Sequence, residues 1–344
     1  MENKHTAYDL KQMQSLPLEA KIIMSQQRIR QWYDYWEGQV YVSFSGGKDS
    51  TVLKHLVETT PGVCDVPSLF VNTGLEYPEI QKFAMSQPNV TTVRPEMRFD
   101  EVIKKYGYPV ISKEVSFKVD NARKDGVCLD DFTKGTTREM RNGGRYSLVK
   151  YQYLLRSDFG ISNKCCDVMK KKPAKAYEKE TGRKAIIGTL AEESAVRQQA
   201  WMKNGCNAFN SQRPVSQPLS FWTEQDILHY IKKYNLPYCS VYGDIVVNTD
   251  ADIPDGQMNI FDYLGDYKEG DRLKTTGCNR TGCVFCVFGI TQDGNPNRFQ
   301  RLKETHPRQY DYCINGGEFV EGKWQPNKEG LGLGYVLDYI GVKY

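Results

Sequence analysis

The fold of this 344-residue chain is decided by one short stretch, Val42-Ser43-Phe44-Ser45-Gly46-Gly47-Lys48-Asp49-Ser50. Residues 40–44 are mostly apolar and β-branched or aromatic, which is typical of a short buried strand, and residues 51–58 have a helical pattern. The two glycines between them let the backbone turn sharply and approach a ligand. Because the free N–H groups at a helix N-terminus attract negative oxygens, the stretch predicts an anion site, to which the two flanking serines add hydroxyl donors.

Six of these residues, from Ser45 to Ser50, resemble the pyrophosphate-binding loop of the ATP-pyrophosphatase (PP-loop) superfamily. The pattern differs from the Walker P-loop, which requires Gly-x-x-x-x-Gly-Lys-Ser/Thr, and from Gly-x-Gly-x-x-Gly. An ordinary turn between a strand and a helix is the alternative explanation. A complete six-residue match directly after a strand favours nucleotide binding over that alternative.

Strands alternate with helices in the residues that follow. Residues 68–72, 90–94 and 185–189 have the pattern of strands, and residues 78–86 and 100–106 that of helices. The alternation predicts an α/β fold with a parallel, twisted sheet that carries helices on both faces. Ligands of such sheets bind at the carboxyl ends of the strands, so we expect the glycine loop to lie at the binding rim.

Composition and charge indicate a globular protein that does not enter a membrane. Charged residues make up 26% and the net charge is +4, too small to indicate nucleic-acid binding by itself. No apolar run approaches the roughly 18 residues of a membrane span, and the N-terminus lacks an apolar signal core, so we expect a cytoplasmic protein. We divide the chain into a helical lead-in (1–37), whose residues 1–16 are frayed, a nucleotide-binding α/β domain (38–240) with a basic, irregular insertion (107–160), and a cysteine-containing C-terminal extension (241–344) that packs on the sheet.

Ten cysteines in a cytoplasmic chain are expected to act as metal ligands or reactive thiols rather than as disulfides. Four of them form two close pairs: Cys165, Cys166, Cys283 and Cys286. Four thiolates suit zinc or an iron–sulfur cluster, and adjacent cysteines fit the usual zinc geometry poorly, so we favour a 4Fe-4S cluster. A zinc site and the absence of any metal stay open, as does the replacement of one ligand by Cys278 or Cys206.

Several motifs together, in this order, resemble the phosphoadenosine phosphosulfate (PAPS) reductase family. The matching pieces span roughly residues 40–290. They are Ser45 to Ser50; Asn72-Thr73-Gly74-Leu75-Glu76-Tyr77-Pro78-Glu79; Cys165-Cys166 with Lys172-Pro173; Gly188-Thr189 with Glu192-Glu193-Ser194 and Arg197; Pro218-Leu219 with Trp222-Thr223-Glu224-Gln225-Asp226-Ile227; and Cys283-Val284-Phe285-Cys286. The combination is far more specific than any single piece.

This resemblance implies an adenine-nucleotide α-hydrolase-like fold and a set of nucleotide-binding residues. The set is Ser43, Ser45, Gly46, Gly47, Lys48, Asp49, Ser50, Asn72, Thr73, Gly74, Glu76, Gly188, Thr189, Glu192 and Arg197. It also implies that Glu192, Glu193 and Arg197 line the substrate end, where Arg197 would pair with phosphate or sulfate. The cysteine pattern looks like that of adenylylsulfate reductases and bacterial PAPS-reducing relatives, which implies a 4Fe-4S cluster beside the substrate.

One feature departs from these reductases, which carry a nucleophilic cysteine in a Glu-Cys-Gly-Leu-His type of C-terminal tail. This chain ends in Tyr339-Ile340-Gly341-Val342-Lys343-Tyr344, and its last cysteine, Cys313, does not match that motif. The overall resemblance is therefore greatest to uncharacterised PAPS-reductase-like proteins of bacterial and phage genomes, a family label that describes ancestry better than activity.

Three functions are compatible with these motifs, of which we expect the first and keep the other two as alternatives. The first is reduction of adenylylsulfate or PAPS to sulfite through attack by Cys278, Cys313 or an external thiol, with Arg197 and Glu193 as further catalytic candidates. The second is ATP-dependent sulfur transfer to tRNA or DNA, which requires Mg²⁺ and a sulfur-donor protein. The third is nucleotide sensing without catalysis. The expected partners are an adenine nucleotide (ATP, adenylylsulfate or PAPS), a thiol reductant or sulfur donor, DNA or RNA in the second case, and a second copy of the chain.

Overall fold

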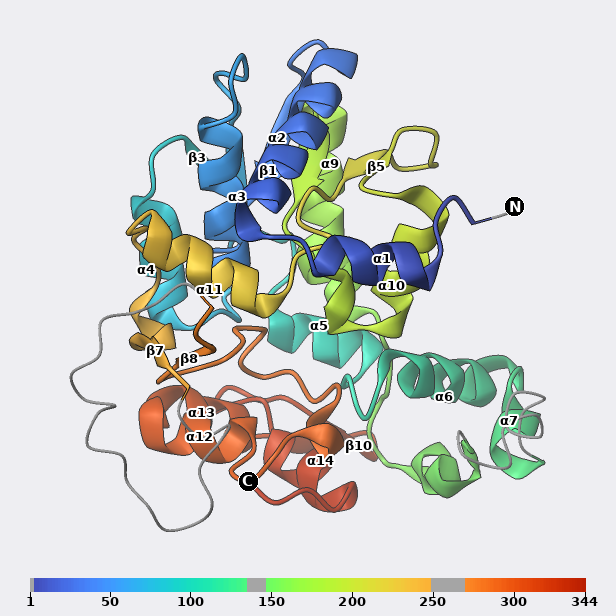
Figure 1. The fold of residues 1–344 in the computed structure, drawn as a ribbon. Coiled ribbons are helices and arrows are strands. Elements are labelled where there is room, and N and C mark those ends of the chain that lie inside the picture. Colours follow the sequence, from blue (N-terminus) through green and yellow to red (C-terminus); the bar gives the residue numbers. More distant parts are fainter. Residues whose placement is uncertain (1–2, 135–146, 249–269) are drawn as a thin grey trace, which may run out of the picture. The chain divides into compact units, whose positions relative to one another are not determined.

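A computed structural model describes residues 3–134, 147–248 and 270–344 (Figure 1). Contacts group the chain into two compact units, each assembled from segments that are separate in the sequence. Unit 1 contains Met1–Asn72, Tyr77–Val93 and Ala174–Thr281, and unit 2 contains Thr73–Glu76, Arg94–Pro173 and Gly282–Tyr344. The division expected from the sequence, with boundaries after residues 37 and 240, stays a prediction.

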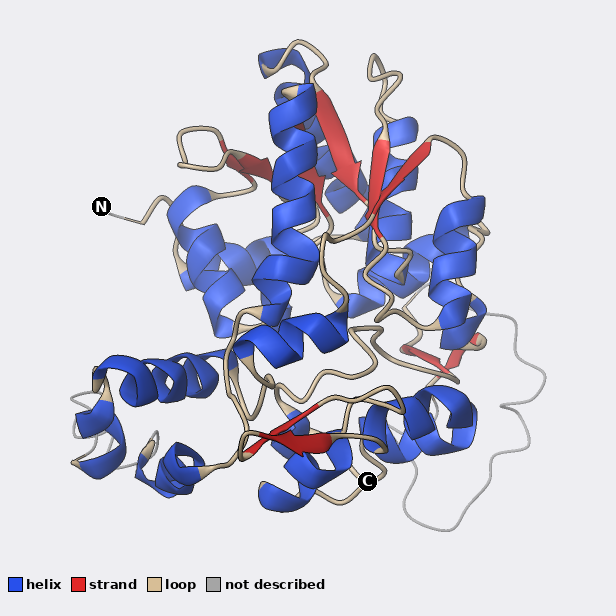
Figure 2. Cartoon of the chain, turned by 180° about the vertical axis from the view of Figure 1, so that it is seen from behind, coloured by secondary structure: helices blue, strands red, loops and turns tan. Residues whose placement is uncertain are grey.

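Unit 1 is built on a six-stranded sheet (Figure 2). In chain order its strands are β1 (Val40–Ser43), β2 (Ser68–Val71), β3 (Val90–Val93), β4 (Lys184–Ile187), β5 (Asn207–Ala208) and β6 (Val215–Ser216). Their order in space is β3-β2-β1-β4-β6-β5, and every neighbouring pair is parallel except β5 with β6. The predicted α/β fold with a parallel sheet is confirmed, and the antiparallel edge strand β5 is a feature that the sequence analysis missed.

Helices cover both faces of this sheet. They are α1 (Ala7–Gln14), α2 (Leu18–Tyr35), α3 (Lys48–Glu58), α4 (Pro78–Ser86), α9 (Lys172–Thr181), α10 (Ala195–Asn204) and α11 (Glu224–Lys233), with 3₁₀ turns η3 (Ala191–Glu193) and η4 (Ser240–Tyr242). Because successive side chains of a strand point to opposite faces, Val40 and Val42 join the large core with α2, α3 and α11. Tyr41, between them, packs on the other face against Tyr177 of α9. A separate antiparallel pair is formed by β7 (Ile245–Val247) and β8 (Leu273–Thr275).

A buried ion pair joins two of these helices. Lys21 Nζ of α2 lies 2.6 Å from Asp226 Oδ2 of α11 and also donates to the Gln14 carbonyl. The same carboxylate accepts from the Thr223 backbone N–H at 2.6 Å, which completes the predicted capping box of α11. One carboxylate therefore both starts α11 and ties it to α2.

Unit 2 is mainly helical. Its elements are α5 (Phe99–Tyr106), α6 (Lys113–Asp125), α7 (Leu129–Thr133), the 3₁₀ helix η1 (Val149–Arg156), the π-helical turn η2 (Asp167–Lys171), the 3₁₀ turn η7 (Ile290–Gln292), α12 (Arg298–Thr305), α13 (Pro307–Ile314), the hairpin β9 (Glu318–Val320) and β10 (Lys323–Gln325), and α14 (Leu333–Tyr339). Phe159 is buried at the centre of an aromatic cluster, with edge-on contacts to Tyr108, Tyr335 and Tyr339. None of the helices in the described ranges has the length and apolar character that crossing a membrane takes.

The structure contradicts two predictions of irregular backbone. Residues 107–160 contain α6, α7 and η1, because Ser112 caps α6 by accepting the Val115 N–H, and Gly126, at φ 68°, ends that helix instead of disrupting it. Part of this segment, residues 135–146, lies outside the described residues. The expected frayed N-terminus contains α1, which a capping box at Thr6 starts and which buries Leu10.

Candidate functional site

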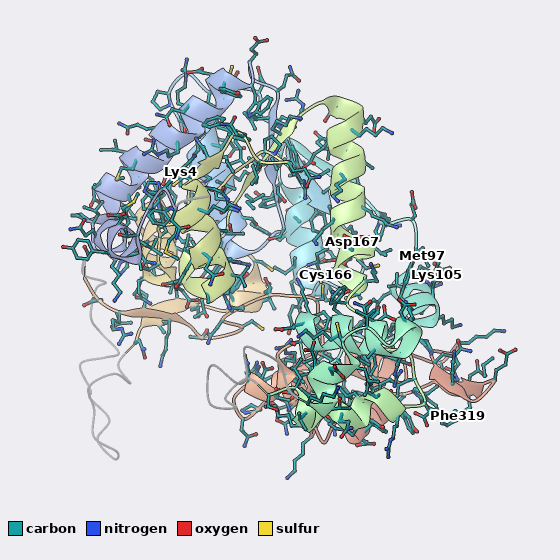
Figure 3. All side chains as sticks on the ribbon, turned by 90° about the vertical axis from the view of Figure 1, so that its right-hand side faces the viewer. Lys4, Met97, Lys105, Cys166, Asp167 and Phe319 are labelled. Atoms are coloured by element: carbon teal, nitrogen blue, oxygen red, sulfur yellow. The ribbon has the colours of Figure 1, made fainter. Side chains whose placement is uncertain are left out.

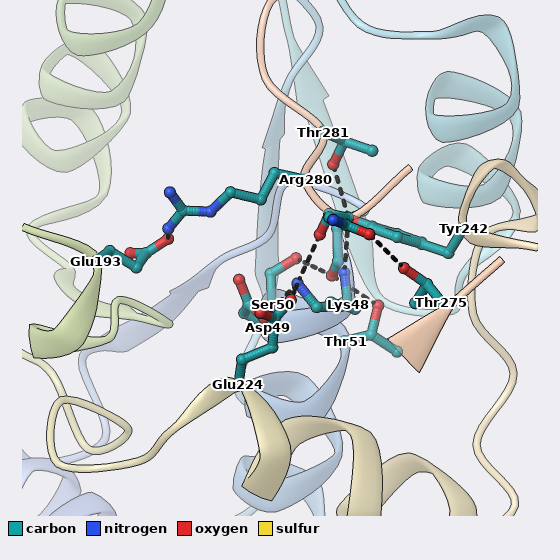
Figure 4. A network of polar contacts seen from close by, with 12 residues as sticks. Lys48, Asp49, Ser50, Thr51, Glu193, Glu224, Tyr242, Thr275, Arg280 and Thr281 are labelled. Atoms are coloured by element: carbon teal, nitrogen blue, oxygen red, sulfur yellow. Dashed lines mark hydrogen bonds and ion pairs between the residues drawn. The ribbon is translucent and has the colours of Figure 1, made fainter. Parts of the chain in front are cut away.

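Residues 44–47 form the predicted turn between β1 and α3, and the helix begins at Lys48, earlier than the expected position 51 (Figure 4). Gly46 has φ +74°, in the left-handed region that favours glycine. A Cβ on Gly46 would also lie 3.0 Å from the Ile80 carbonyl oxygen and 3.1 Å from Ala84 Cβ, so α4 leaves no room for a side chain there. Gly47 is the N-cap residue of α3 in extended conformation. Both backbone geometry and space therefore require glycine at position 46.

The serine hydroxyls of the loop bind the loop's own backbone. Ser50 Oγ accepts from the Ser45 N–H at 3.2 Å and donates to the Gly47 carbonyl at 2.9 Å. Ser45 Oγ in turn accepts from the Gly47 N–H at 3.3 Å. These bonds hold the loop in its turned conformation, and the expected donation of the two hydroxyls to a ligand stays a prediction.

Lys48 is buried and points across the loop. Its Nζ donates to the Asn279 carbonyl at 3.0 Å and lies 3.2 Å from Glu224 Oε1 and 3.6 Å from Asp49 Oδ1. Among the described residues, that buried Asp49 oxygen accepts no hydrogen bond. Burial raises the pKa of Asp49, and the Glu224 carboxylate adds to the shift.

Two hydroxyls from later in the chain lie over the loop. The Tyr242 hydroxyl accepts from the Lys48 backbone N–H at 3.2 Å and lies 2.7 Å from Thr281 Oγ1. The sequence analysis missed both residues, as well as Asn279, because no local pattern marks them. Only the polar, aromatic character of the last hundred residues was available as a signal.

A pocket of about 760 Å³, including the space open to solvent, lies beside the loop, and we call it the unit 1 pocket. It is lined by Lys48, Asp49, Leu190, Glu192, Glu193, Glu224, Asn279 and Arg280. Four of these side chains are carboxylates and two are cationic. Burial raises the pKa of Glu192, whose carboxylate accepts the Glu224 backbone N–H at 2.6 Å. The pocket can thus attract a metal cation as well as hold an anion through backbone N–H groups.

One carboxylate of this pocket serves two arginines. Glu193 pairs with both Arg197 and Arg280, and Figure 4 shows the pair with Arg280. Burial lowers the pKa of Arg197, and the charge of Arg280 acts in the same direction. The structure therefore brings the predicted Glu193 and Arg197 together and adds Arg280, which the sequence analysis did not identify.

The other predicted nucleotide-binding residues fall into two groups. A Cβ on Gly188 would lie 3.1 Å from the Asp49 carbonyl oxygen, so the end of β4, with Thr189 next to it, contacts the start of α3. Ser43 ends β1, and Asn72 follows β2 in unit 1. The remaining three, Thr73, Gly74 and Glu76, belong to unit 2, where the Glu76 carboxylate accepts from both the N–H and the hydroxyl of Thr73.

The four predicted ligand cysteines line one pocket of unit 2, which we call the thiol pocket: Cys165, Cys166, Cys283 and Cys286. Its remaining lining is apolar apart from one lysine: Leu75, Phe99, Pro109, Met169 and Lys170. Cys166 and Asp167 lie where η2 begins (Figure 3). The Cys286 N–H donates to the Cys283 carbonyl at 3.0 Å in a tight turn, and the Val284 N–H donates to the Leu75 carbonyl at 2.8 Å. The turn thus directs one cysteine pair toward the other.

Charge in the thiol pocket is unevenly distributed. The sulfur atoms of Cys165 and Cys166 lie 4.0 Å apart, and their contact raises the pKa of Cys165 and lowers that of Cys166, where Lys113 and Lys170 also favour the thiolate. Burial raises the pKa of Cys283 to about 11 although Lys170 opposes the shift. A bound metal would favour the thiolate of Cys283 over the thiol, because metal ligation requires thiolates.

Within the described residues, no group of three or more His, Cys, Asp or Glu side chains is close enough to hold a metal ion. A cubane cluster carries its irons on separate corners, so its four thiolates lie farther apart than the ligands of a single ion. An all-sulfur donor set in an apolar pocket also matches the chemistry of such a cluster. The residues present therefore fit a 4Fe-4S cluster better than zinc.

Three other cysteines are candidates from the sequence: Cys206 and Cys278 as replacement cluster ligands, and Cys278 and Cys313 as attacking thiols. Cys206 is buried in the core of unit 1, where its sulfur accepts from the Ser220 hydroxyl, and neither it nor Cys278 lines the thiol pocket. Cys313 is completely buried, and burial raises its pKa well above the usual value. Because the thiolate is the nucleophilic form, this burial disfavours Cys313 as an attacking thiol, and its catalytic role stays a prediction.

Comparison with known proteins identifies the class. The model of the phosphoadenosine phosphosulfate reductase domain family matches residues 39–124 and 136–287, more than half of the chain. The chain belongs to this family. A curated relative, the adenosine 5′-phosphosulfate reductase of Lysinibacillus sphaericus (strain C3-41), is 40% identical over 77 residues, which are 22% of this chain and 31% of the reductase. The chain thus spans about a third of the length of that relative.

Solved structures are similar at low identity. The PAPS reductase of Candida auris in a phosphate complex is 16% identical, with a TM-score of 0.35 over 70% of this chain and 92% of that one. The FMN adenylyltransferase of Candida glabrata in complex with ATP is 12% identical, with a TM-score of 0.38 over 68% and 65%. The U34-tRNA thiolase NcsA of Methanococcus maripaludis with its 4Fe-4S cluster is 15% identical, with a TM-score of 0.32 over 64% and 66%. Scores this low say nothing about the reaction.

Proposed function

We propose that this chain is an enzyme of sulfur metabolism that binds an adenine nucleotide in the unit 1 pocket and a 4Fe-4S cluster in the thiol pocket. Family membership and the glycine loop at the N-terminus of α3 support the nucleotide. The four cysteines that share one apolar pocket support the cluster. Cys165, Cys166, Cys283 and Cys286 would hold it, and Lys170 would offset part of its negative charge. When bound, the cluster would supply electron transfer or a site for sulfur.

For the reaction, we propose ATP-dependent activation of an acceptor for sulfur transfer. The observation that carries this choice is the excess of carboxylates in the pocket, four against two cationic side chains. A phosphate chain needs added positive charge in such surroundings, and Mg²⁺ bound with one or two carboxylates and substrate phosphates supplies it. Asp49 Oδ1, which accepts no hydrogen bond among the described residues and lies 3.6 Å from Lys48 Nζ, fits this role. In the step itself, an acceptor oxygen attacks the α-phosphorus of ATP, and the bond to the leaving pyrophosphate breaks.

Reduction of adenylylsulfate or PAPS to sulfite is the second candidate. It is favoured by the 40% identity to an adenosine 5′-phosphosulfate reductase, although the match spans only 77 residues. A thiolate would attack the sulfate sulfur and release the nucleotide, and a second thiol would then release sulfite and form a disulfide. The attacking thiol would be Cys278 or an external one, since Cys313 is buried.

A product assay separates the two candidates. Anaerobically purified, iron-replete protein is offered Mg-ATP, adenylylsulfate and PAPS separately, each with a dithiol reductant. Pyrophosphate from ATP, formed faster when RNA or DNA is added, is the expected result. Sulfite with AMP or adenosine 3′,5′-bisphosphate would replace this proposal with the second candidate. Tight nucleotide binding without product in any condition would indicate a sensor. Asp49→Asn is the control that should remove either activity.

A further inference from the structure

A side chain of the protein itself accepts a hydrogen bond at the N-terminus of α3. Lys48 is the first residue of that helix, and its backbone N–H donates to the Tyr242 hydroxyl at 3.2 Å (Figure 4). Tyr242 is only 2% exposed, so its hydroxyl is held at the loop and not in solvent. An N–H group that an anion would require is therefore satisfied internally.

The hydroxyl occupies the space that a bound oxyanion needs. A Cβ on Gly47 would lie 3.1 Å from the Tyr242 hydroxyl and 3.4 Å from Thr281 Oγ1, so both groups are packed against the loop backbone. An N–H group has a single hydrogen, and a phosphate oxygen that accepts it at normal distance takes the place of the phenol oxygen. Nucleotide binding through Lys48 N–H therefore requires that Tyr242 move.

The chemistry of the pair suits a removable neutral cap. Burial raises the pKa of Tyr242, so the phenol stays protonated at neutral pH. It accepts from the Lys48 N–H and pairs with Thr281 Oγ1 at 2.7 Å. Since a neutral acceptor binds an N–H group more weakly than an anionic oxygen does, a phosphate can compete for the same donor.

The segments that carry the two hydroxyls are linked to each other. The Gly277 N–H donates to the Tyr242 carbonyl at 2.8 Å, and the Cys278 N–H donates to the Val241 carbonyl at 3.0 Å. The bond from Lys48 Nζ to the Asn279 carbonyl adds one more tie between this assembly and the loop. Backbone hydrogen bonds therefore join residues 240–244 to residues 275–281, and these two segments together position Tyr242 and Thr281.

We propose that Tyr242 is an exchangeable cap of the anion loop, which an oxygen of the nucleotide's phosphate chain displaces. The inference rests on the proposed nucleotide site and adds a residue that sets its affinity. Without ligand, the phenol oxygen accepts the hydrogen bond of a buried N–H group that would otherwise be unsatisfied. When a ligand binds, the free energy lost with the bond from Lys48 N–H to Tyr242 offsets part of the free energy gained with the new bond to phosphate. The cap therefore weakens binding and limits it to ligands whose anionic oxygen accepts the N–H more strongly than the phenol does.

The test is Tyr242→Phe, which keeps the ring and removes only the hydroxyl. We expect binding of Mg-ATP, or of inorganic pyrophosphate as the bare anion, to become about 5- to 10-fold tighter, which corresponds to one neutral hydrogen bond. The Lys48 amide of the ligand-free variant should also exchange its hydrogen faster. Thr281→Val should act in the same direction with a smaller effect. Tyr41→Phe is the matched control, because its buried hydroxyl donates to Glu178 Oε1 on the other face of the sheet and its removal should leave affinity unchanged.

The outcomes separate this inference from the proposed function. Nucleotide binding by the wild type that Tyr242→Phe leaves equal or weaker would overturn the cap and leave the nucleotide site standing. A wild type that binds no nucleotide, with a Tyr242→Phe variant that binds pyrophosphate more tightly, would support the cap and overturn the nucleotide proposal. Absence of anion binding by both proteins would overturn both. Unchanged exchange of the Lys48 amide would overturn the cap by itself.

Discussion

The unit 1 pocket and the thiol pocket have opposite chemical character. The unit 1 pocket is polar, has four carboxylates, and has its lysine and arginine already paired with protein groups. The thiol pocket is apolar apart from Lys170 and offers four sulfur atoms. The unit 1 pocket suits a hydrated, highly charged ligand that replaces protein groups as the partner of its side chains. The thiol pocket suits a soft metal cluster that stays bound.

The two pockets also differ in how the chain builds them. The loop of unit 1 is contiguous, and its geometry depends on two glycines and two serines within six residues. The thiol pocket collects its cysteines from two distant segments and has no local geometry of its own until the chain folds. Substitutions in one pocket should therefore leave the other intact, which makes the comparison testable.

The largest expected effect is on the thiol pocket. Cys283→Ser combined with Cys286→Ser should lower iron and acid-labile sulfide per chain by roughly tenfold or more, because two of four thiolate ligands are removed. Nucleotide affinity should stay unchanged. The double variant Cys64→Ser with Cys128→Ser, neither of which lines the pocket, is the matched control and should retain iron. Wild-type protein that binds zinc and no iron would refute the cluster.

The next effect concerns the framework of unit 1. Lys21→Met should destabilise this unit by about 3–5 kcal/mol, because it leaves the buried Asp226 carboxylate without its partner. Denaturant unfolding measures the loss, and iron content of the folded protein should not change. Lys232→Met, at an exposed position of α11, is the control. A loss below about 1 kcal/mol, typical of exposed ion pairs, would contradict the burial argument.

A smaller effect is expected at the glycine loop. Gly46→Ala should weaken nucleotide binding by roughly 30- to 100-fold, since left-handed backbone costs about 1–2 kcal/mol and the methyl group must also displace α4. Gly182→Ala carries the backbone cost alone, because Gly182 has φ +73° but nothing within 4 Å of its added Cβ, so its free energy of unfolding gives that cost by itself. Calorimetric titration of the Gly46→Ala variant with nucleotide gives the affinity. A Gly46→Ala variant that binds nucleotide as tightly as the wild type would contradict the prediction.

The smallest effect is a pH dependence specific to the acidic pocket. Burial raises the pKa of Asp49 and of Glu192, so these carboxyls take up protons at a higher pH than exposed ones. Lowering the pH from neutral toward the ordinary carboxyl range without divalent cations should therefore reduce repulsion and tighten nucleotide binding by about 2- to 5-fold, with the onset at a higher pH than for exposed carboxyls. Glu192→Gln should flatten the profile. Weaker binding at the lower pH would contradict this sign.

Sequence alone determined the features that depend on neighbouring residues. The alternation of strands and helices predicted the parallel sheet of unit 1, and the Ser45 to Ser50 motif predicted the turn before α3. Both are local, since strand pattern, glycine conformation and helix start depend on residues a few positions apart. The cysteine pairs were likewise visible as residue types and spacing, although their common pocket was an inference from chemistry.

Only the tertiary structure decided which distant groups meet. Tyr242 and Thr281 reach the glycine loop, and Arg280 reaches the pocket beside it, through contacts that no local pattern encodes. Burial also disfavours the thiolate of Cys313, because the pKa of a thiol depends on the side chains packed around it and not on its neighbours in sequence. Local backbone preferences thus determined the loop, whereas long-range packing decided what covers it and which charges surround it.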